Sequence, residues 1–304
     1  MKIVVFGGSG FLGSHVCDKL THAGHEVTIY DLTESPWLRD DQQMILGDIL
    51  DEEKVQKALV DVQAVYNFAG IADIGEANVR PLDTVRYNIL GNSVILEACR
   101  KAAVKRYVFA SSVYVYSKSG GFYRCSKQAC ELYIECYSEN YGLEYSILRY
   151  GSLYGSRADK RNAIYRFIQE ALTDKRITYY GSPEALREYT HVEDAAQASV
   201  EILKPEYANE HVVLTGHQPM AVSNVLKMIA EMLGEEIEFV FERDPRHVHY
   251  DLTPYAFSPK FGKKFTPTLH VDLGQGILRT IEEQHASLHP EFDNINGYLV
   301  KESS

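Results

Sequence analysis

Two tyrosine–lysine pairs with the same spacing lie close together in the middle of the chain. Tyr114 and Lys118 occur in "SSVYVYSKSG", and Tyr123 and Lys127 occur in "GGFYRCSKQACELY". An unperturbed tyrosine has a pKa of about 10 and is a poor base at neutral pH, but a nearby ammonium favours the phenolate and lowers that pKa. On a helix, residues four apart share a face, so both members of such a pair can contact one bound cofactor.

The helix requirement separates the two pairs. Tyr114 and Lys118 follow the end of an apolar strand, "KRYVFASS", and precede "SGG", so we expect no helix there. Tyr123 and Lys127 open the amphipathic stretch "YRCSKQACELYIECY". The chain has 21 tyrosines, so spacing alone says little. The predicted helix makes Tyr123 and Lys127 the candidate catalytic pair.

The elements around this pair alternate between strand and helix. Apolar strands are predicted at 2–6, 26–30, 64–70, 105–112 and 144–150, with helices at 11–24, 81–103 and 126–142. This alternation predicts a parallel sheet covered on both faces. After about residue 150 the pattern loosens into helices at 161–172, 220–233 and 272–284 and short strands such as 236–241. We expect a nucleotide-binding domain over 1–150, with a return near 187–204, and a smaller, mainly substrate-binding part over 151–304.

A glycine-rich turn follows the first predicted strand. "GGSGFLG" places Gly7, Gly10 and Gly13 so that the turn opens a helix. Alone, these glycines could simply form a tight turn. After a buried strand and before a helix, they predict a dinucleotide site, because backbone without Cβ lets a pyrophosphate approach the helix N-terminus. The fold class predicted is α/β, a Rossmann-type doubly wound parallel sheet with a smaller mixed α/β part.

Acidic residues follow the second and third strands. Asp31 ends "VTIYDL", where a carboxylate accepts hydrogen bonds from a ribose 2′-hydroxyl and repels a 2′-phosphate. No Arg or Lys follows at once, so NAD is predicted over NADP. A turn cap is the structural alternative for Asp31. Asp48 and Ile49, in "GDIL", could border the adenine, although a capping Asp48 remains open.

Composition excludes several function classes. The chain has 304 residues and a net charge of −11, and no basic stripe indicates nucleic-acid binding. No apolar run reaches membrane-spanning length, and the first residues do not resemble a signal peptide. The five cysteines have no metal-ligand spacing. We expect no metal, no nucleic acid and no membrane, free thiols, and a cytoplasmic location.

Several motifs, taken in order, resemble those of extended short-chain dehydrogenases/reductases, and more narrowly the nucleotide-sugar epimerase/dehydratase group. They are "GGSGFLG", Asp31, "NFAG", "YNILGN", "FASSVYVY", "YRCSK", "ILRYGSLYG" and "REYTHVED". The resemblance covers nearly the whole chain. It implies that Tyr123 is the acid/base, that Lys127 orients it and binds the nicotinamide ribose, and that Ser112 hydrogen-bonds the reacting hydroxyl.

The same resemblance implies the remaining site residues. Asn88 would support the active-site helix, although a helix-interior polar group facing a loop is the alternative. Arg187 would hold the nucleotide diphosphate, with a surface ion pair to Glu184 or Glu188 as the alternative. Ser152 stands where the family usually has Asn, so a phosphate contact there would come from a shorter hydroxyl. The implied cofactor-binding set is Gly7, Gly10, Phe11, Leu12, Gly13, Asp31, Asp48, Ile49, Ala69, Gly70, Asn88, Tyr123 and Lys127.

The subclass depends on the residues beside Ser112. Family dehydratases usually carry Asp and Glu at the positions of Val113 and Tyr114, decarboxylating relatives a Glu at Tyr114, and relatives that epimerise carbons flanking a ketone a Cys at Val113. What remains is hydride chemistry alone. We expect an NAD-dependent nucleotide-sugar 4-epimerase, with a dehydrogenase or reductase on the same scaffold, or a non-catalytic NAD-binding regulator, as alternatives.

One departure from the family is the short connection "KSGGF" at 118–122, which predicts a wider or more open sugar pocket. A homodimer is expected from a second apolar face on two helices, formed by Ile89, Val94, Ile95, Leu132, Ile134 and Tyr137, with burial inside one chain as the alternative. The basic residues Arg243, Arg246, Lys263 and Lys264 could approach a phosphate or face water.

Overall fold

The computed structural model describes residues 1–243, 249–255 and 273–288. The chain divides into two units, Met1–Ser258 and Pro259–Ser304. In the second unit the structure describes one helix, α10 (Leu273–Leu288), where the sequence predicts a helix.

A seven-stranded parallel sheet forms the centre of the first unit, in the order β10-β6-β5-β4-β1-β2-β3. Its strands are β1 (Lys2–Phe6), β2 (Glu26–Asp31), β3 (Gln43–Leu46), β4 (Ala64–Asn67), β5 (Arg106–Ser112), β6 (Glu144–Tyr150) and β10 (Glu210–Leu214). The α/β doubly wound class predicted from the alternating pattern is confirmed. The edge strand β10 was not predicted, and it lies beside β6 although about sixty residues of chain separate the two.

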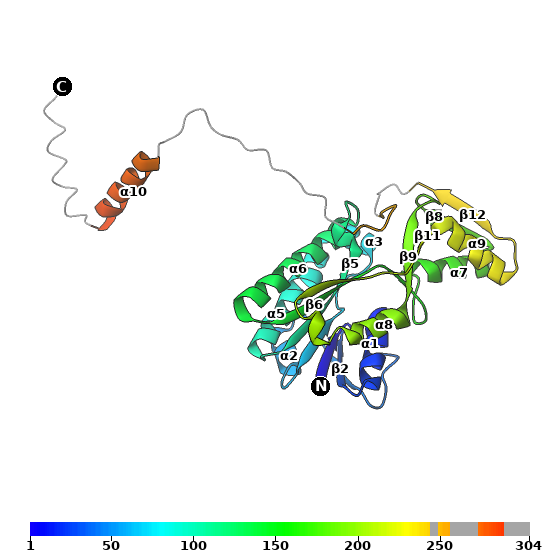
Figure 1. Cartoon of the computed structure of the whole chain (residues 1–304), viewed down its shortest axis with the longest axis horizontal. Coiled ribbons are helices and arrows are strands. Elements are labelled where there is room, and N and C mark those ends of the chain that lie inside the picture. Colours follow the sequence, from blue (N-terminus) through cyan, green and yellow to red (C-terminus); the bar gives the residue numbers. More distant parts are fainter. Residues whose placement is uncertain (244–248, 256–272, 289–304) are drawn as a thin grey trace, which may run out of the picture. The chain divides into compact units, whose positions relative to one another are not determined.

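Helices cover both faces of this sheet, as Figure 1 shows. One face carries α2 (Glu52–Ala58), α5 (Gly91–Lys101) and α6 (Gly121–Tyr141), and the other carries α1 (Phe11–His22) and α8 (Val192–Glu201). Alternate residues of β1 serve the two cores: Val4 and Phe6 face one, Ile3 and Val5 the other. Burial on both sides is why the strands read as continuous apolar runs.

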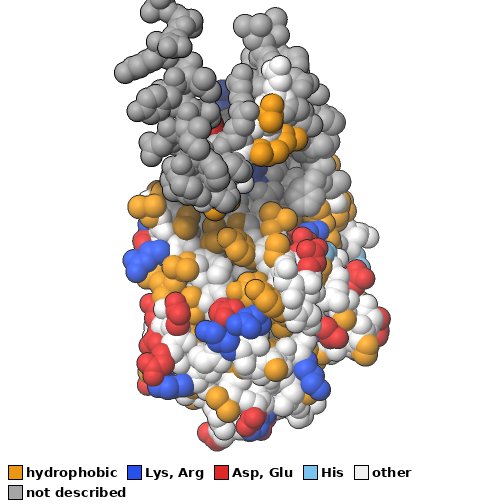
Figure 2. All heavy atoms as spheres, turned by 90° about the vertical axis from the view of Figure 1, so that its left-hand side faces the viewer, with side chains coloured by type: hydrophobic (Ala, Val, Ile, Leu, Met, Phe, Trp, Pro, Cys, Tyr) orange, Lys and Arg blue, Asp and Glu red, His pale blue; other side chains and the backbone are white. Residues whose placement is uncertain are grey.

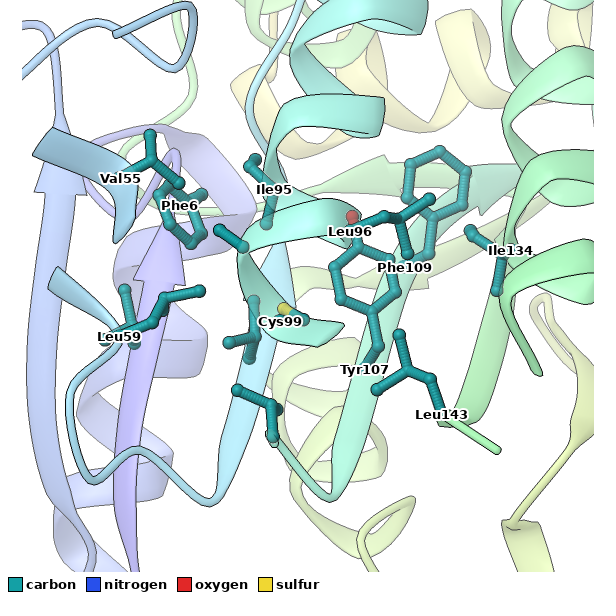
Figure 3. Close-up of a cluster of buried hydrophobic side chains, with 14 of the residues drawn as sticks. Phe6, Val55, Leu59, Ile95, Leu96, Cys99, Tyr107, Phe109, Ile134 and Leu143 are labelled. Atoms are coloured by element: carbon teal, nitrogen blue, oxygen red, sulfur yellow. The ribbon is translucent and has the colours of Figure 1, made fainter. Parts of the chain in front are cut away.

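The core under α5 and α6 is the larger of the two sheet cores. Figure 3 shows Phe6 from β1, Tyr107 and Phe109 from β5, and Ile95 and Ile134 from the two helices meeting in one cluster. Each of these side chains is essentially inaccessible to water. Apolar burial on this scale is the dominant favourable term in folding, so the cluster fixes α6 against the sheet.

The predicted helix 81–103 is continuous but not uniform. It runs from α4 (Pro81–Thr84) through a π-helical stretch, Val85–Leu90, into α5. A π-helical turn inside an α-helix is rare and is often found at functional sites. Asn88 lies within this stretch and is buried.

The apolar dimer face predicted on these helices is partly wrong. Ile95 and Ile134 are buried in the core, and Ile89, Val94 and Tyr137 pack against it. The alternative, burial inside one chain, therefore accounts for most of the set. Leu132 is 62% exposed, and Leu82, Val85 and Leu90 are exposed as well. Figure 2 views the side on which α5 and α6 lie in Figure 1 and shows hydrophobic side chains among charged ones.

Between Ser152 and Glu242, the described chain also forms two small sheets, which pack with helices. The strands are β7 (Ser152–Tyr154), β8 (Arg176–Tyr180), β9 (Leu186–His191), β11 (Pro219–Ala221) and β12 (Glu238–Glu242). The helices α7 (Ala163–Asp174) and α9 (Val222–Leu233) pack on a core that includes Phe167, Ile177 and Leu226. The predicted helices and the strand near 236–241 are present. The domain boundary predicted at residue 150 stays a prediction.

Candidate active site

The glycine turn connects β1 to α1 without room for side chains. A Cβ on Gly13 would lie 2.2 Å from the carbonyl oxygen of Gly7, and one on Gly7 would lie 2.6 Å from the amide nitrogen of Ala69. Gly7 also has φ +76°, which L side chains rarely adopt. The turn therefore holds Ala69 and the start of α1 close to each other.

The N-terminus of α1 keeps its amide groups available. Gly10 is the N-cap, no side chain of the described residues caps the helix, and its first turn, which starts at Phe11 and Leu12, has no acidic residue. Helix N-termini concentrate unpaired N–H groups and partial positive charge, which favours an anion such as a pyrophosphate. The residues present thus fit a bound dinucleotide.

Asp31 stands at the end of β2 beside the glycine turn. Its Oδ2 accepts a hydrogen bond from the backbone N–H of Ser9 at 3.0 Å, and its Oδ1 a longer one from Thr33 at 3.4 Å. The carboxylate is part-exposed, and a carboxylate has room for further donors. The turn-capping alternative and the ribose-binding prediction are therefore compatible, because one side chain can do both.

Asp48 and Ile49 follow β3. The Asp48 side chain accepts from the backbone N–H of Leu50 at 2.9 Å, so it shapes the turn, whereas Asp51 caps α2. Ile49 is buried, and its methyl group occupies the place that a Cβ on Gly91 would need. Their predicted contact with the adenine stays a prediction.

Asn88 ties three elements together. Its Oδ1 accepts from the N–H of Ile71 at 2.7 Å, and its Nδ2 donates to Ser126 on α6 at 2.9 Å. A Cβ on Gly70 would lie 2.6 Å from the same Oδ1. Ser126 in turn donates to the carbonyl of Tyr123 at 2.8 Å. This chain of contacts is the geometry expected if Asn88 supports α6.

Tyr123 and Lys127 lie one turn apart on α6, as the spacing predicts. Ser112, at the end of β5, lies close enough to the Tyr123 phenol to lower its pKa. The Lys127 ammonium donates to the carbonyl of Ala110 at 2.7 Å and lies 5.8 Å from the centre of the Tyr123 ring. Three residues that the sequence places on two elements therefore meet at the carboxyl ends of the parallel strands.

Burial acts against ionisation in this group. Desolvation raises the pKa of Tyr123 to about 12, and the hydrogen bond from Ser112 opposes that rise. Desolvation likewise lowers the pKa of the Lys127 ammonium. Both shifts have the sign expected for burial of the charged form. Strongly perturbed groups of this kind, gathered at one place, are typical of active sites.

The other tyrosine–lysine pair does not share a helix. Tyr114 lies in a 3₁₀ turn, Val113–Tyr116, and α6 begins only at Gly121, so Lys118 is outside both. Burial raises the pKa of Tyr114 well above its ordinary value and keeps the phenol neutral. The prediction that Tyr123 and Lys127 share a helix, and that Tyr114 and Lys118 do not, is confirmed.

The short connection before α6 is a hydrogen-bonded turn. Gly120 and Gly121 have φ +96° and +49°. The guanidinium of Arg124 donates to the carbonyls of Ser117 and Lys118, at 3.0 and 2.8 Å. The two glycines allow the chain to reverse in few residues.

Arg187, on β9, is buried with 7% of its surface exposed. Its guanidinium donates to the carbonyl of Leu186 and, at 3.4 Å, to the hydroxyl of Tyr179, and it lies 4.5 Å from the centre of the Tyr250 ring. No carboxylate of the described residues forms an ion pair with it, so the predicted alternative, a surface pair with Glu184 or Glu188, is wrong. Burying a cation is costly, and within the described part of the chain this one has no counter-charge.

Sequence reasoning missed the side chains around Arg187 and Tyr114. Tyr250 packs on both residues, and His249 accepts or donates a 2.7 Å hydrogen bond to the Tyr114 hydroxyl. No local pattern marks these residues, because they come from a segment with no regular structure. Ser152, at the start of β7, is part-exposed. Arg243 is exposed, and Arg246, Lys263 and Lys264 lie outside the described residues.

The metal, membrane and cysteine predictions can be compared with the structure only over the described residues. Within the described residues there is no cluster of His, Cys, Asp or Glu that could hold a metal ion. No helix in that part of the chain is long and apolar enough to cross a membrane. All five cysteines are free, and Cys17, Cys99 and Cys130 are buried.

Comparison with known proteins agrees with this geometry. The chain is 30% identical over 300 residues to a putative UDP-glucose 4-epimerase of Methanocaldococcus jannaschii, which covers 92% of this chain and 97% of that protein. The structure of a UDP-glucose 4-epimerase from Thermotoga maritima with UDP-glucose superposes with a TM-score of 0.76 at 26% identity, covering 85% of this chain and 90% of that one.

A Thermus thermophilus UDP-glucose 4-epimerase in complex with NAD gives the same TM-score, 0.76, at 26% identity, and covers 85% of this chain and 91% of that one. Residues 3–215 match the NAD dependent epimerase/dehydratase family. The cofactor predicted from the glycine turn and Asp31 is that of the family, NAD. By this match and by its fold, the chain belongs to the NAD dependent epimerase/dehydratase family.

Proposed function

We propose that this protein is an NAD-dependent nucleotide-sugar epimerase that acts by reversible oxidation at sugar carbon 4. The observation that carries the proposal is the meeting of Ser112, Tyr123 and Lys127 at the edge of the sheet that also holds the glycine turn. Relatives described as UDP-glucose 4-epimerases support the substrate class, a nucleotide-diphosphate sugar.

In the proposed reaction, Tyr123 removes the proton of the sugar hydroxyl. Ser112, which lies beside the phenol, donates its hydroxyl proton in a hydrogen bond to the same substrate oxygen as that oxygen becomes a carbonyl. The Lys127 ammonium has three N–H donors, of which Ala110 takes one, and its charge favours the phenolate. When bound, NAD would supply a reversible acceptor for the hydride on carbon 4.

The residues next to Ser112 favour hydride chemistry alone. Val113 is a buried aliphatic side chain, and Tyr114 is a neutral phenol, so neither position offers the carboxylic acid needed to eliminate water. The reaction proposed therefore ends with the sugar intact and changed only in configuration.

The remaining site roles are part of the same proposal. Arg187 binds the diphosphate with a contact from the Ser152 hydroxyl, and Asn88 holds α6 through Ser126. Gly7, Gly10, Gly13, Ala69 and Gly70 leave room for the dinucleotide. A homodimer and a cytoplasmic location stay predictions; light scattering at micromolar concentration tests the first.

The deciding experiment is incubation of the NAD-loaded protein with a panel of nucleotide sugars, followed by NMR and by absorbance at the NADH band. A 4-epimer formed without net NADH supports the proposal. Steady NADH release with a ketosugar product favours the dehydrogenase, which the short 117–122 turn supports by leaving less chain to retain a ketone. Tight NAD binding without turnover across the panel favours the non-catalytic regulator.

A further inference from the structure

Tyr114 occupies a position beside the candidate catalytic residues that the proposed reaction leaves without a role. It comes two residues after Ser112, whose Oγ accepts its backbone N–H at 3.3 Å. Its ring meets that of Tyr123 edge-on, with centroids 6.3 Å apart and planes at 79°. The Tyr114 ring therefore lies directly beside the Tyr123 ring.

The Tyr114 ring is held from several directions. A Cβ on Gly120 would lie 2.7 Å from Cδ1 of Tyr114, so the backbone of the short turn packs directly on the ring. The Tyr250 ring lies 4.7 Å away, tilted by 48°, and His249 holds the hydroxyl through Nδ1 at 2.7 Å. A ring fixed in this way cannot rotate aside for a ligand without losing these contacts, and a fixed wall selects by size.

The same ring belongs to a layer that joins the two ends of the proposed site. Tyr114 contacts Tyr123 on one side and Tyr250 on the other. The guanidinium carbon of Arg187 lies 4.5 Å from the centre of the Tyr250 ring. If Tyr123 meets the sugar and Arg187 meets the diphosphate, the sugar lies along this layer. Aromatic side chains with a few polar groups are the usual lining of such sites.

We propose that Tyr114 is a specificity-determining residue whose fixed ring, supported by Gly120, limits the size of the sugar, so that the site takes nucleotide pentoses and unsubstituted nucleotide hexoses and rejects N-acetylated ones. The inference rests on the proposed function. The proposal also gives the short 117–122 turn a consequence: the Tyr114 ring, and not the turn, would bound the sugar there.

The test compares UDP-xylose, UDP-glucose and UDP-N-acetylglucosamine as substrates of the NAD-loaded wild type and of Tyr114→Ala. Removing the ring should raise kcat/KM for UDP-N-acetylglucosamine relative to UDP-glucose by about tenfold or more, the range in which pocket size discriminates. Tyr114→Phe keeps the ring and should keep the wild-type order of preference. A ratio that Tyr114→Ala leaves unchanged overturns the proposal.

The two glycines of the turn supply a matched pair of variants. Gly120→Ala and Gly121→Ala both place a side chain at positive φ, but the new Cβ meets the Tyr114 ring in the first and the Asn78 amide in the second. We expect Gly120→Ala to change the sugar preference and Gly121→Ala to leave it as in the wild type. Equal changes in both would assign the effect to the turn and not to Tyr114.

A binding measurement separates this inference from the proposed reaction. Calorimetry of the NAD-loaded protein should show that Tyr114→Ala weakens the binding of UDP-glucose but not the binding of UDP. The reason is that UDP lacks the sugar that touches the ring. This result supports the inference even if the wild type turns over no sugar, an outcome that defeats the epimerase alone. Equal weakening of UDP and UDP-glucose, or of neither, overturns the role of Tyr114.

Discussion

The large sheet and the small sheets each bury an arginine near the candidate site, and the two arginines have opposite surroundings. Arg149, on β6, forms a two-point ion pair with Glu131 of α6, through Nε at 3.0 Å and Nη2 at 2.6 Å. Arg187, on β9, contacts a carbonyl, a phenol and the Tyr250 ring, with no carboxylate among the described residues.

This difference separates structure from proposed binding. Glu131 also accepts a hydrogen bond from Ser111, the residue before Ser112, so the Arg149 pair fixes β5, β6 and α6 to one another. Arg149 of the large sheet thus has its counter-charge within the chain, and this ion pair helps to position the candidate catalytic groups. Among the described residues the small sheets offer Arg187 no carboxylate, and under the proposed function the substrate diphosphate balances its charge.

The largest effect should come from Tyr123→Phe. The change removes the proton-transfer group of the proposed reaction and leaves the ring in place, so kcat should fall by about 10³-fold, within the range for general acid–base catalysis. NAD binding should persist, as measured by fluorescence titration. Tyr114→Phe is the control and should lower kcat by less than about tenfold. If Tyr114→Phe were instead the inactive variant, the helix argument for Tyr123 would be wrong.

Arg149→Met should have the largest effect on stability. It leaves the Glu131 carboxylate buried without its partner, which typically costs about 3–5 kcal/mol. Urea unfolding measures the loss. The double variant Glu131→Met with Arg149→Met removes both charges and should recover most of the stability. A single variant as stable as the wild type would show that water or another group satisfies Glu131.

Arg187→Met should behave in the opposite way. The free energy of unfolding should stay the same or rise, because a buried cation without a carboxylate is removed. The KM for a nucleotide sugar should increase about ten- to 100-fold, since hydrogen bonds to charged groups contribute about 1.5–3 kcal/mol. Arg187→Lys keeps the positive charge but loses the planar guanidinium with its paired donors. Its KM should lie between those of the wild type and Arg187→Met. Lost stability with unchanged KM would assign Arg187 to the fold.

The smallest expected effect concerns cofactor choice. Asp31→Ser removes the carboxylate that would repel a 2′-phosphate, and the preference for NAD over NADP should fall by about tenfold, the factor that corresponds to about 1.4 kcal/mol. Parallel titrations with NAD and NADP measure it. Asp48→Ser tests the second acidic residue, whose side chain accepts a hydrogen bond from the backbone N–H of Leu50. Equal binding of NADP by the wild type would contradict the prediction outright.

Local patterns predicted the parts of the site that adjoin one another along the chain. The glycine turn between a strand and a helix, Asp31 at the end of the next strand, and Tyr123 four residues before Lys127 all follow from strand burial and helix geometry. The π-helical stretch around Asn88 and the edge strand β10 were not predictable, because neither has a distinctive pattern of its own.

The sequence by itself therefore determined the fold class, the cofactor and the candidate catalytic pair, since each depends on residues close together in the chain. Only the tertiary structure decided that Tyr250 packs on Tyr114 and Arg187, that Asn88 reaches Ser126, and that Ile95 and Ile134 belong to the core and not to a dimer face. These contacts join residues from distant segments. Their partners are chosen by packing across the whole fold, which no short pattern records.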